Sequence, residues 1–65
     1  MKLIVNGQSR EISARTLEDA LVELGFENAV VATAVNGDFV RKGARTARPL
    51  TDGDRLEILA PMQGG

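Results

Sequence analysis

The first apolar run of the chain is short and is followed at once by a turn signal. Residues 3–5 (Leu-Ile-Val) have the composition of a β-strand. Asn6-Gly7 is among the strongest signals for a two-residue hairpin turn, and residues 8–13 then resume an extended pattern. The pattern predicts an N-terminal β-hairpin.

A helical pattern begins at Thr16. A hydroxyl residue followed three positions later by an acid, Asp19, is typical of a helix N-terminus. The apolar residues that follow have the i, i+3, i+4, i+7 spacing of one helical face: Leu17, Ala20, Leu21 and Leu24. Gly25 comes just after the last of them, where a left-handed residue commonly ends a helix. We therefore expect a helix over residues 16–24.

The second half of the chain predicts three more strands. Residues 30–35 and 39–40 flank a second Asn-Gly turn at residues 36–37, which predicts another hairpin. Residues 42–49 have no clear period and contain glycine and proline, so a loop is expected there. Residues 55–60 alternate between apolar and other positions, as a last strand would.

This order of elements predicts an α+β fold, in which one helix covers one face of a mixed sheet of four to five strands. Residues 1–60 form the domain, and residues 61–65 form a flexible tail, because proline cannot donate to a strand ladder and glycine resists ordering. The expected core lies between helix and sheet and consists of Leu3, Val5, Ile12, Leu17, Leu21, Leu24, Val35, Val40, Leu50, Leu56 and Ile58.

The composition excludes most kinds of catalytic and metal-binding chemistry. The chain has 65 residues and contains neither cysteine nor histidine, so thiolate nucleophiles, disulfides, imidazole catalysis and the usual zinc sites are all absent. A chain of this size has little room for a substrate pocket within its core. We expect no catalytic residues, no metal site and no enzymatic activity. Absence of disulfides and of a signal-peptide pattern predicts a cytoplasmic location.

Charge argues against two classes of partner. The net charge of −1 offers no electrostatic attraction to nucleic acid or to an anionic membrane. Four of the eight basic residues lie close together, at Arg41, Lys42, Arg45 and Arg48. We interpret this basic stretch as a solvated loop.

The last two residues are the remaining candidate for a reactive group. Gly64-Gly65 carries no Cβ, so a partner's narrow channel can close around its backbone. A terminal carboxylate on Gly65 can attack the α-phosphate of ATP and give an acyl-adenylate open to a sulfur or amine nucleophile. The ATP site, the magnesium ion and the transfer cysteine would belong to the partner enzyme, so this chain needs no cofactor of its own.

Three stretches together resemble the ThiS-type sulfur carriers of thiamine biosynthesis. They are Ala34-Val35-Asn36-Gly37 before Phe39-Val40, then residues 52–58 (Asp-Gly-Asp-Arg-Leu-Glu-Ile), then residues 61–65 (Pro-Met-Gln-Gly-Gly). The resemblance covers essentially the whole chain. It departs from the family's pattern between Gly43 and Leu50, where many members have a bulkier, often aromatic residue.

The resemblance implies a β-grasp (ubiquitin-like) fold and a set of partners. An E1-like, ThiF-type enzyme would adenylate Gly65, a sulfur donor such as a persulfide-bearing desulfurase would supply the thiocarboxylate sulfur, and a ThiG-type thiazole synthase would receive it. Gly65 would bear the thiocarboxylate and Gly64 would thread the partners' channels. Gln63 and Met62 occupy positions that contact the activating enzyme in such proteins.

Two apolar residues point away from the predicted core. Leu59 does so if Leu56 and Ile58 face the helix, and Ile4 does so if its neighbours Leu3 and Val5 face inward. Because the first and last strands of a β-grasp sheet are neighbours, we expect Ile4 and Leu59 to form one partner-binding patch near the start of the tail.

Three other functions remain open at this point. A MoaD-type carrier for molybdopterin synthesis uses the same tail chemistry. A ubiquitin-like modifier shares the adenylated intermediate but forms an isopeptide bond with lysine. A binding module would not need Gly64 and Gly65 at all.

Overall fold

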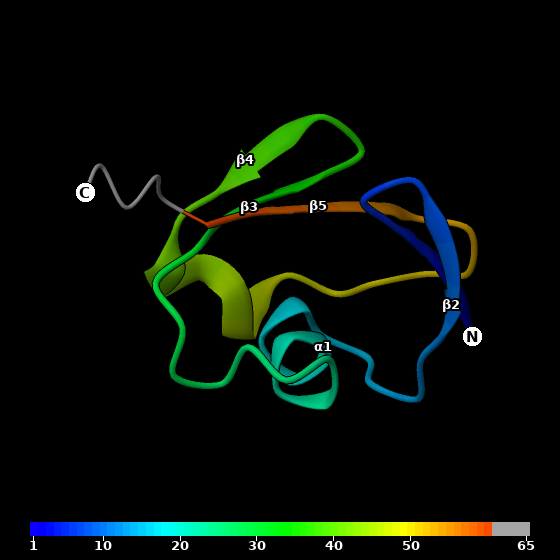
Figure 1. Cartoon of the computed structure of the whole chain (residues 1–65), viewed down its shortest axis with the longest axis horizontal. Helices are drawn as coiled ribbons and strands as arrows, with labels where there is room; N and C mark the ends of the chain where they lie inside the picture. Colours follow the sequence, from blue (N-terminus) through cyan, green and yellow to red (C-terminus); the bar gives the residue numbers. More distant parts are fainter. Residues whose placement is uncertain (61–65) are drawn as a thin grey trace.

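A five-stranded mixed sheet with one α-helix on a single face forms the protein (Figure 1). The structure is a computed structural model and describes residues 1–60. Its strands are β1 (Lys2–Val5), β2 (Gln8–Glu11), β3 (Ala32–Val35), β4 (Asp38–Val40) and β5 (Arg55–Leu59). Helix α1 spans Leu17–Glu23 and a 3-10 helix, η1, spans Lys42–Ala47. The predicted α+β class and single covering helix are confirmed. The predicted division at residue 60 stays a prediction, because residues 61–65 lie outside the described residues.

Strand β5 lies at the centre of the sheet. The strand order is β2-β1-β5-β3-β4, and Figure 1 shows β5 crossing the molecule between the two hairpins. β5 pairs in parallel with β1 and antiparallel with β3. The last described strand therefore joins the two hairpins into one sheet.

Both predicted hairpins are present, and their turns have the same conformation. Asn6 and Gly7 have φ values of 49° and 83°, and Asn36 and Gly37 have φ values of 52° and 87°. Two successive residues with positive φ are the mark of the type I′ turn, which matches the twist of antiparallel strands. Asparagine followed by glycine is the pair that tolerates this backbone best.

The predicted helix is confirmed at both ends. The Thr16 side chain accepts a hydrogen bond from the Asp19 N–H at 3.2 Å, which caps the N-terminus. Gly25 has a φ of 93°, and the Phe26 N–H bonds back to the Leu21 carbonyl at 2.8 Å. These bonds satisfy backbone groups that a helix end otherwise leaves without partners.

The core matches the prediction except at one position. Leu24 is half-buried rather than buried, because it is the C-cap residue of α1 and lies at the edge of the helix–sheet interface. Ala20 is fully buried in the middle of the helix instead. The other ten predicted residues are all buried.

The loop predicted over residues 42–49 contains a 3-10 helix, and the basic stretch is solvated at Arg41 and Lys42 but not at Arg45. Residues 42–47 form η1, and Arg45 within it is only 6% exposed. Its Nε donates to the Thr33 hydroxyl at 3.1 Å and its Nη2 donates to the Val31 carbonyl at 2.6 Å. These long-range acceptors allow the guanidinium to be buried.

No helix in the described part of the chain is long and apolar enough to cross a membrane.

Candidate functional site

The four predicted site residues at the end of the chain lie outside the described residues. These are Met62, Gln63, Gly64 and Gly65. What the structure describes is the strand that leads to them, β5, and the sheet face on the side opposite α1. We call this side the open face.

The open face carries every second residue of β5. Leu56 and Ile58 are buried, whereas Arg55, Glu57 and Leu59 are exposed. This alternation follows from the two-residue period of a strand with one covered face. Charged and apolar side chains are therefore presented in one row along the central strand.

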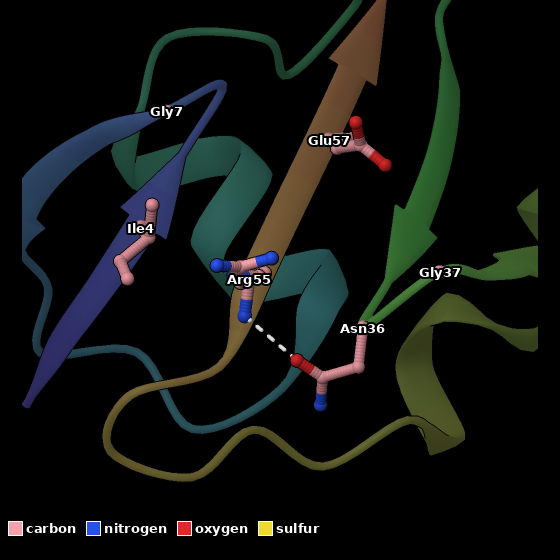
Figure 2. Close-up of a pocket in the computed structure, with 6 residues that line it drawn as sticks. All are labelled: Ile4, Gly7, Asn36, Gly37, Arg55 and Glu57. Atoms are coloured by element: carbon pink, nitrogen blue, oxygen red, sulfur yellow. Dashed lines mark hydrogen bonds between the residues drawn. The ribbon is translucent and has the colours of Figure 1, made fainter.

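An open cleft lies at the beginning of this row (Figure 2). Its walls are the two Asn-Gly turns, and its floor is formed by β1 and β5. The residues that line it are Ile4, Gly7, Asn36, Gly37, Arg55 and Glu57. Within the described residues there is no group of histidine, cysteine or acidic side chains that could hold a metal ion. The cleft can make contacts with a partner, and Arg55 and Glu57 are the charged residues that line it.

The expected patch of Ile4 with Leu59 is not formed. Both residues lie on the open face, as predicted, but the register pairs Ile4 with Arg55. Leu59 lies four residues further along β5, about 13 Å away at the usual rise of a strand. The charged Glu57 lies between them. Strand adjacency was predicted correctly, and the register separates the two side chains.

Phe39 is the apolar neighbour that the sequence interpretation missed. It lies opposite Ala34 on β3, while Leu59 lies opposite Ala32 on the same strand. Phe39 is 72% exposed and Leu59 is 67% exposed. Ala32 and Ala34 lie on β3 between the strands of Phe39 and Leu59, so the four residues form one apolar area on the open face, which Glu57 borders opposite Ala34. We call it the Phe39–Leu59 patch.

The outward orientation of Phe39 could have been inferred from the Asn-Gly turn. A two-residue turn at Asn36-Gly37 fixes Val35 opposite Asp38, and therefore Ala34 opposite Phe39. Since Val35 faces the core, Ala34 and Phe39 must both face outward.

The asparagines of both turns also bind β5 through their side chains. Asn36 accepts the Arg55 N–H at 2.9 Å and donates to the Asp54 carboxylate at 3.0 Å (Figure 2 shows the bond to Arg55). This donation by Asn36, with that of the Thr51 N–H, holds the pKa of Asp54 below its ordinary value. Asn6 accepts the Ile58 N–H at 2.8 Å and donates to the Ile58 carbonyl at 3.0 Å. The central strand is thus held at both ends.

Comparison with known proteins identifies the family. Residues 3–65 match the sequence profile of the ThiS family. The chain belongs to the ThiS family. The chain is 39% identical over 61 residues to the sulfur carrier protein ThiS of Thermus thermophilus, covering 94% of this chain and 95% of that protein.

Two further relatives of this ThiS-family chain were found. A crystal structure of the thiamine biosynthesis protein ThiS from Geobacter metallireducens matches it with a TM-score of 0.81 and 33% identity, covering all of both chains. The resemblance to a β-grasp fold is confirmed by this likeness. A thiazole synthase of Paramagnetospirillum magneticum is 42% identical over 66 residues, and the ThiS-family chain spans 20% of its length.

Proposed function

We propose that this chain is a sulfur carrier of thiamine biosynthesis whose reactive group is the Gly65 carboxylate. The observation that carries the proposal is the match to the ThiS family, which extends through Gly65. The sequence supports it by elimination, because cysteine and histidine are absent and cannot provide a competing nucleophile. The described fold supports it as well, since its central strand leads directly to the last residues.

The proposed chemistry begins at the α-phosphorus of ATP and continues at the Gly65 carbonyl carbon. A carboxylate oxygen of Gly65 attacks the α-phosphate of ATP, and pyrophosphate leaves, which gives the acyl-adenylate. The outer sulfur of the donor's persulfide then attacks the Gly65 carbonyl carbon and AMP leaves, which gives an acyl disulfide. A second thiol of the partner enzymes attacks the donor-side sulfur and breaks the S–S bond, so that a disulfide forms between the two enzyme thiols and the thiocarboxylate is released. ATP and magnesium are bound by the activating enzyme. The carrier itself is not an enzyme in this scheme and works in the cytoplasm.

Three partners follow from this chemistry. An E1-like, ThiF-type enzyme supplies adenylation, and a persulfide-bearing desulfurase supplies sulfur. A ThiG-type thiazole synthase consumes the thiocarboxylate. This last partner is supported by the thiazole synthase of Paramagnetospirillum magneticum, because a region of that protein resembles the whole of this chain. Joining a carrier-like region to the enzyme would raise its effective concentration there.

The Phe39–Leu59 patch is the surface we propose for docking these enzymes. Its two large side chains are more than two-thirds exposed, and Leu59 is the last residue of β5. Apolar groups of this kind gain free energy when a partner covers them. A partner that grips the patch would hold the carrier beside the residues that react. Ile4, at the cleft, would lie toward the margin of the same contact.

Leu59→Asp and Phe39→Asp are each expected to weaken binding to the activating enzyme by about tenfold or more, the effect of losing an interfacial anchor. Stability of the free carrier should change little, because neither side chain is buried. Titration calorimetry with the purified enzyme measures the affinity. Val30→Asp is the matched control, since Val30 is 80% exposed but lies outside the patch. Equal affinities for all three variants and the wild type would remove the patch from the proposal.

Intact-protein mass spectrometry tests the proposed function itself. The carrier is incubated with ATP, magnesium, a ThiF-type enzyme and a persulfide source. We expect a mass gain equal to the difference between one sulfur and one oxygen atom, and a return to the original mass when thiazole synthase and its substrates are added. Adducts with lysine-containing proteins would instead indicate a modifier. An unchanged mass with an enzyme that loads another ThiS protein would contradict the proposal.

A further inference from the structure

Strand β1 ends before its neighbour β5 does. The parallel ladder pairs Ile4 with Arg55 and Val5 with Leu56, and the last backbone bond on this side runs from the Asn6 N–H to the Leu56 carbonyl at 2.9 Å. The chain then turns away through Asn6-Gly7 to form β2. Ile58 lies two residues beyond Leu56, with no β1 residue paired to it in the described ladder.

The backbone groups of Ile58 point toward this missing part of β1. Along β5, the backbone groups of successive residues point alternately toward β3 and toward β1. The Arg55 carbonyl points toward the β3 side, where it accepts the Asn36 N–H. The Leu56 carbonyl bonds toward β1, so Ile58 faces the same way. If β1 were longer, its backbone would bond both the N–H and the carbonyl of Ile58.

The Asn6 side chain supplies both bonds. Its Oδ1 accepts the Ile58 N–H at 2.8 Å and its Nδ2 donates to the Ile58 carbonyl at 3.0 Å. One side-chain amide thus takes the place of the strand that is absent there, across 52 positions of sequence. Ile58 is one residue before Leu59, the end of β5.

We infer that Asn6 is a positioning residue for sulfur loading: its side chain holds the end of β5 on the β1 side, as the β3 ladder does on the other, and so helps to fix the point from which the reactive residues follow. This inference rests on the proposed function of the chain as a carrier. A carboxylate must reach the enzyme's ATP in a narrow range of positions, so a loose strand end would lower the fraction of bound carrier that reacts.

The protein contains its own matched control. Asn36 occupies the same position in the same type of turn, and its side chain also binds β5. It binds the beginning of the strand, however, at Arg55 and beside Asp54. Glycine accepts positive φ without strain, so Asn6→Gly and Asn36→Gly preserve both turns and remove the same side chain at opposite ends of β5.

The two variants are compared in steady-state loading with the activating enzyme and by amide hydrogen exchange under native conditions. We expect Asn6→Gly to lower kcat for loading by about tenfold, with KM for the carrier nearly unchanged because the docking patch remains. Asn36→Gly should stay within about twofold of the wild type, since its bonds lie far from the reacting end. Exchange of the Ile58 N–H should accelerate in Asn6→Gly beyond any change in the slowest-exchanging core amides.

Several results would overturn the inference. One is an equal loss of kcat in both variants, which would mean that general loosening of the sheet is responsible. Another is an unchanged kcat in Asn6→Gly despite fast exchange at Ile58. If Asn6→Gly does not fold, Asn6→Asp serves instead, because it keeps an acceptor for the Ile58 N–H and loses only the donor. A wild-type chain that never gains sulfur would reject the proposed function first, and this inference with it.

Discussion

Deletion of Gly65 is expected to abolish sulfur loading while the domain stays as stable as before. Removing one residue shortens the reach of an extended chain by about 3.3–3.6 Å. Because misplacement of a reacting group by about 1 Å can cost about 100-fold in rate, we expect loading to fall by at least about that factor. The new terminal residue is also glycine, so the comparison changes the position of the carboxylate and leaves its chemistry alone.

Intact mass after incubation with the activating enzyme measures this loss, and urea unfolding measures stability. The free energy of unfolding should stay within about 0.5 kcal/mol of the wild type. A chain extended by one glycine is the matched control, because it moves the carboxylate outward by the same amount and should fail to load as well. Normal loading of either variant would mean that the Gly65 carboxylate is not placed by chain length, and would contradict its proposed role.

Thr33→Val is expected to cost about 2–3 kcal/mol of stability, although the two side chains have nearly the same shape. The Thr33 hydroxyl accepts the Arg45 Nε–H at 3.1 Å and donates to the Val40 carbonyl at 2.9 Å. Both Thr33 and Arg45 are buried. Valine would leave a buried guanidinium donor without one of its two acceptors, and this penalty is larger for a charged group than for a neutral one.

Thermal unfolding checks this prediction, since a domain of this size loses about 4–8 °C in Tm for each kcal/mol. Thr46→Val is the control: Thr46 lies on the same η1 as Arg45 but is exposed, so its replacement should change stability by less than about 0.5 kcal/mol. Adding Arg45→Met to Thr33→Val should recover part of the loss, because an apolar pair leaves no buried charge. Equal Tm values for the two valine variants would show that the Arg45 contact does not stabilise the fold.

Elements with a local signal could be predicted from the sequence. The Asn-Gly pairs predicted two hairpins because few residues other than asparagine and glycine accept two successive positive φ values. Thr16 and Gly25 marked the ends of the helix through bonds to its own backbone. Strand alternation placed Leu56 and Ile58 in the core and Leu59 outside.

Features that depend on distant partners could not be predicted in this way. Arg45 is basic and lies in a stretch without apolar period, and nothing nearby in the sequence indicates that Thr33 and Val31 accept its hydrogen bonds. The prediction of an Ile4–Leu59 patch was wrong because a parallel pairing has no connecting turn to fix its register. Asn6 was interpreted only as a turn residue, and its bonds to Ile58 depend on where β1 stops beside β5.

The central position of β5 also determines when the sheet can assemble during folding. Both hairpins precede β5 in the chain, yet the sheet joins them only through β5. Isolated hairpins are marginally stable in water, and pairings between distant parts of a chain form late in folding. A chain whose synthesis stops before residue 55 would therefore have no continuous sheet, and would present no assembled docking face to the activating enzyme. With docking as proposed, a product that lacks β5 would therefore compete poorly for that enzyme.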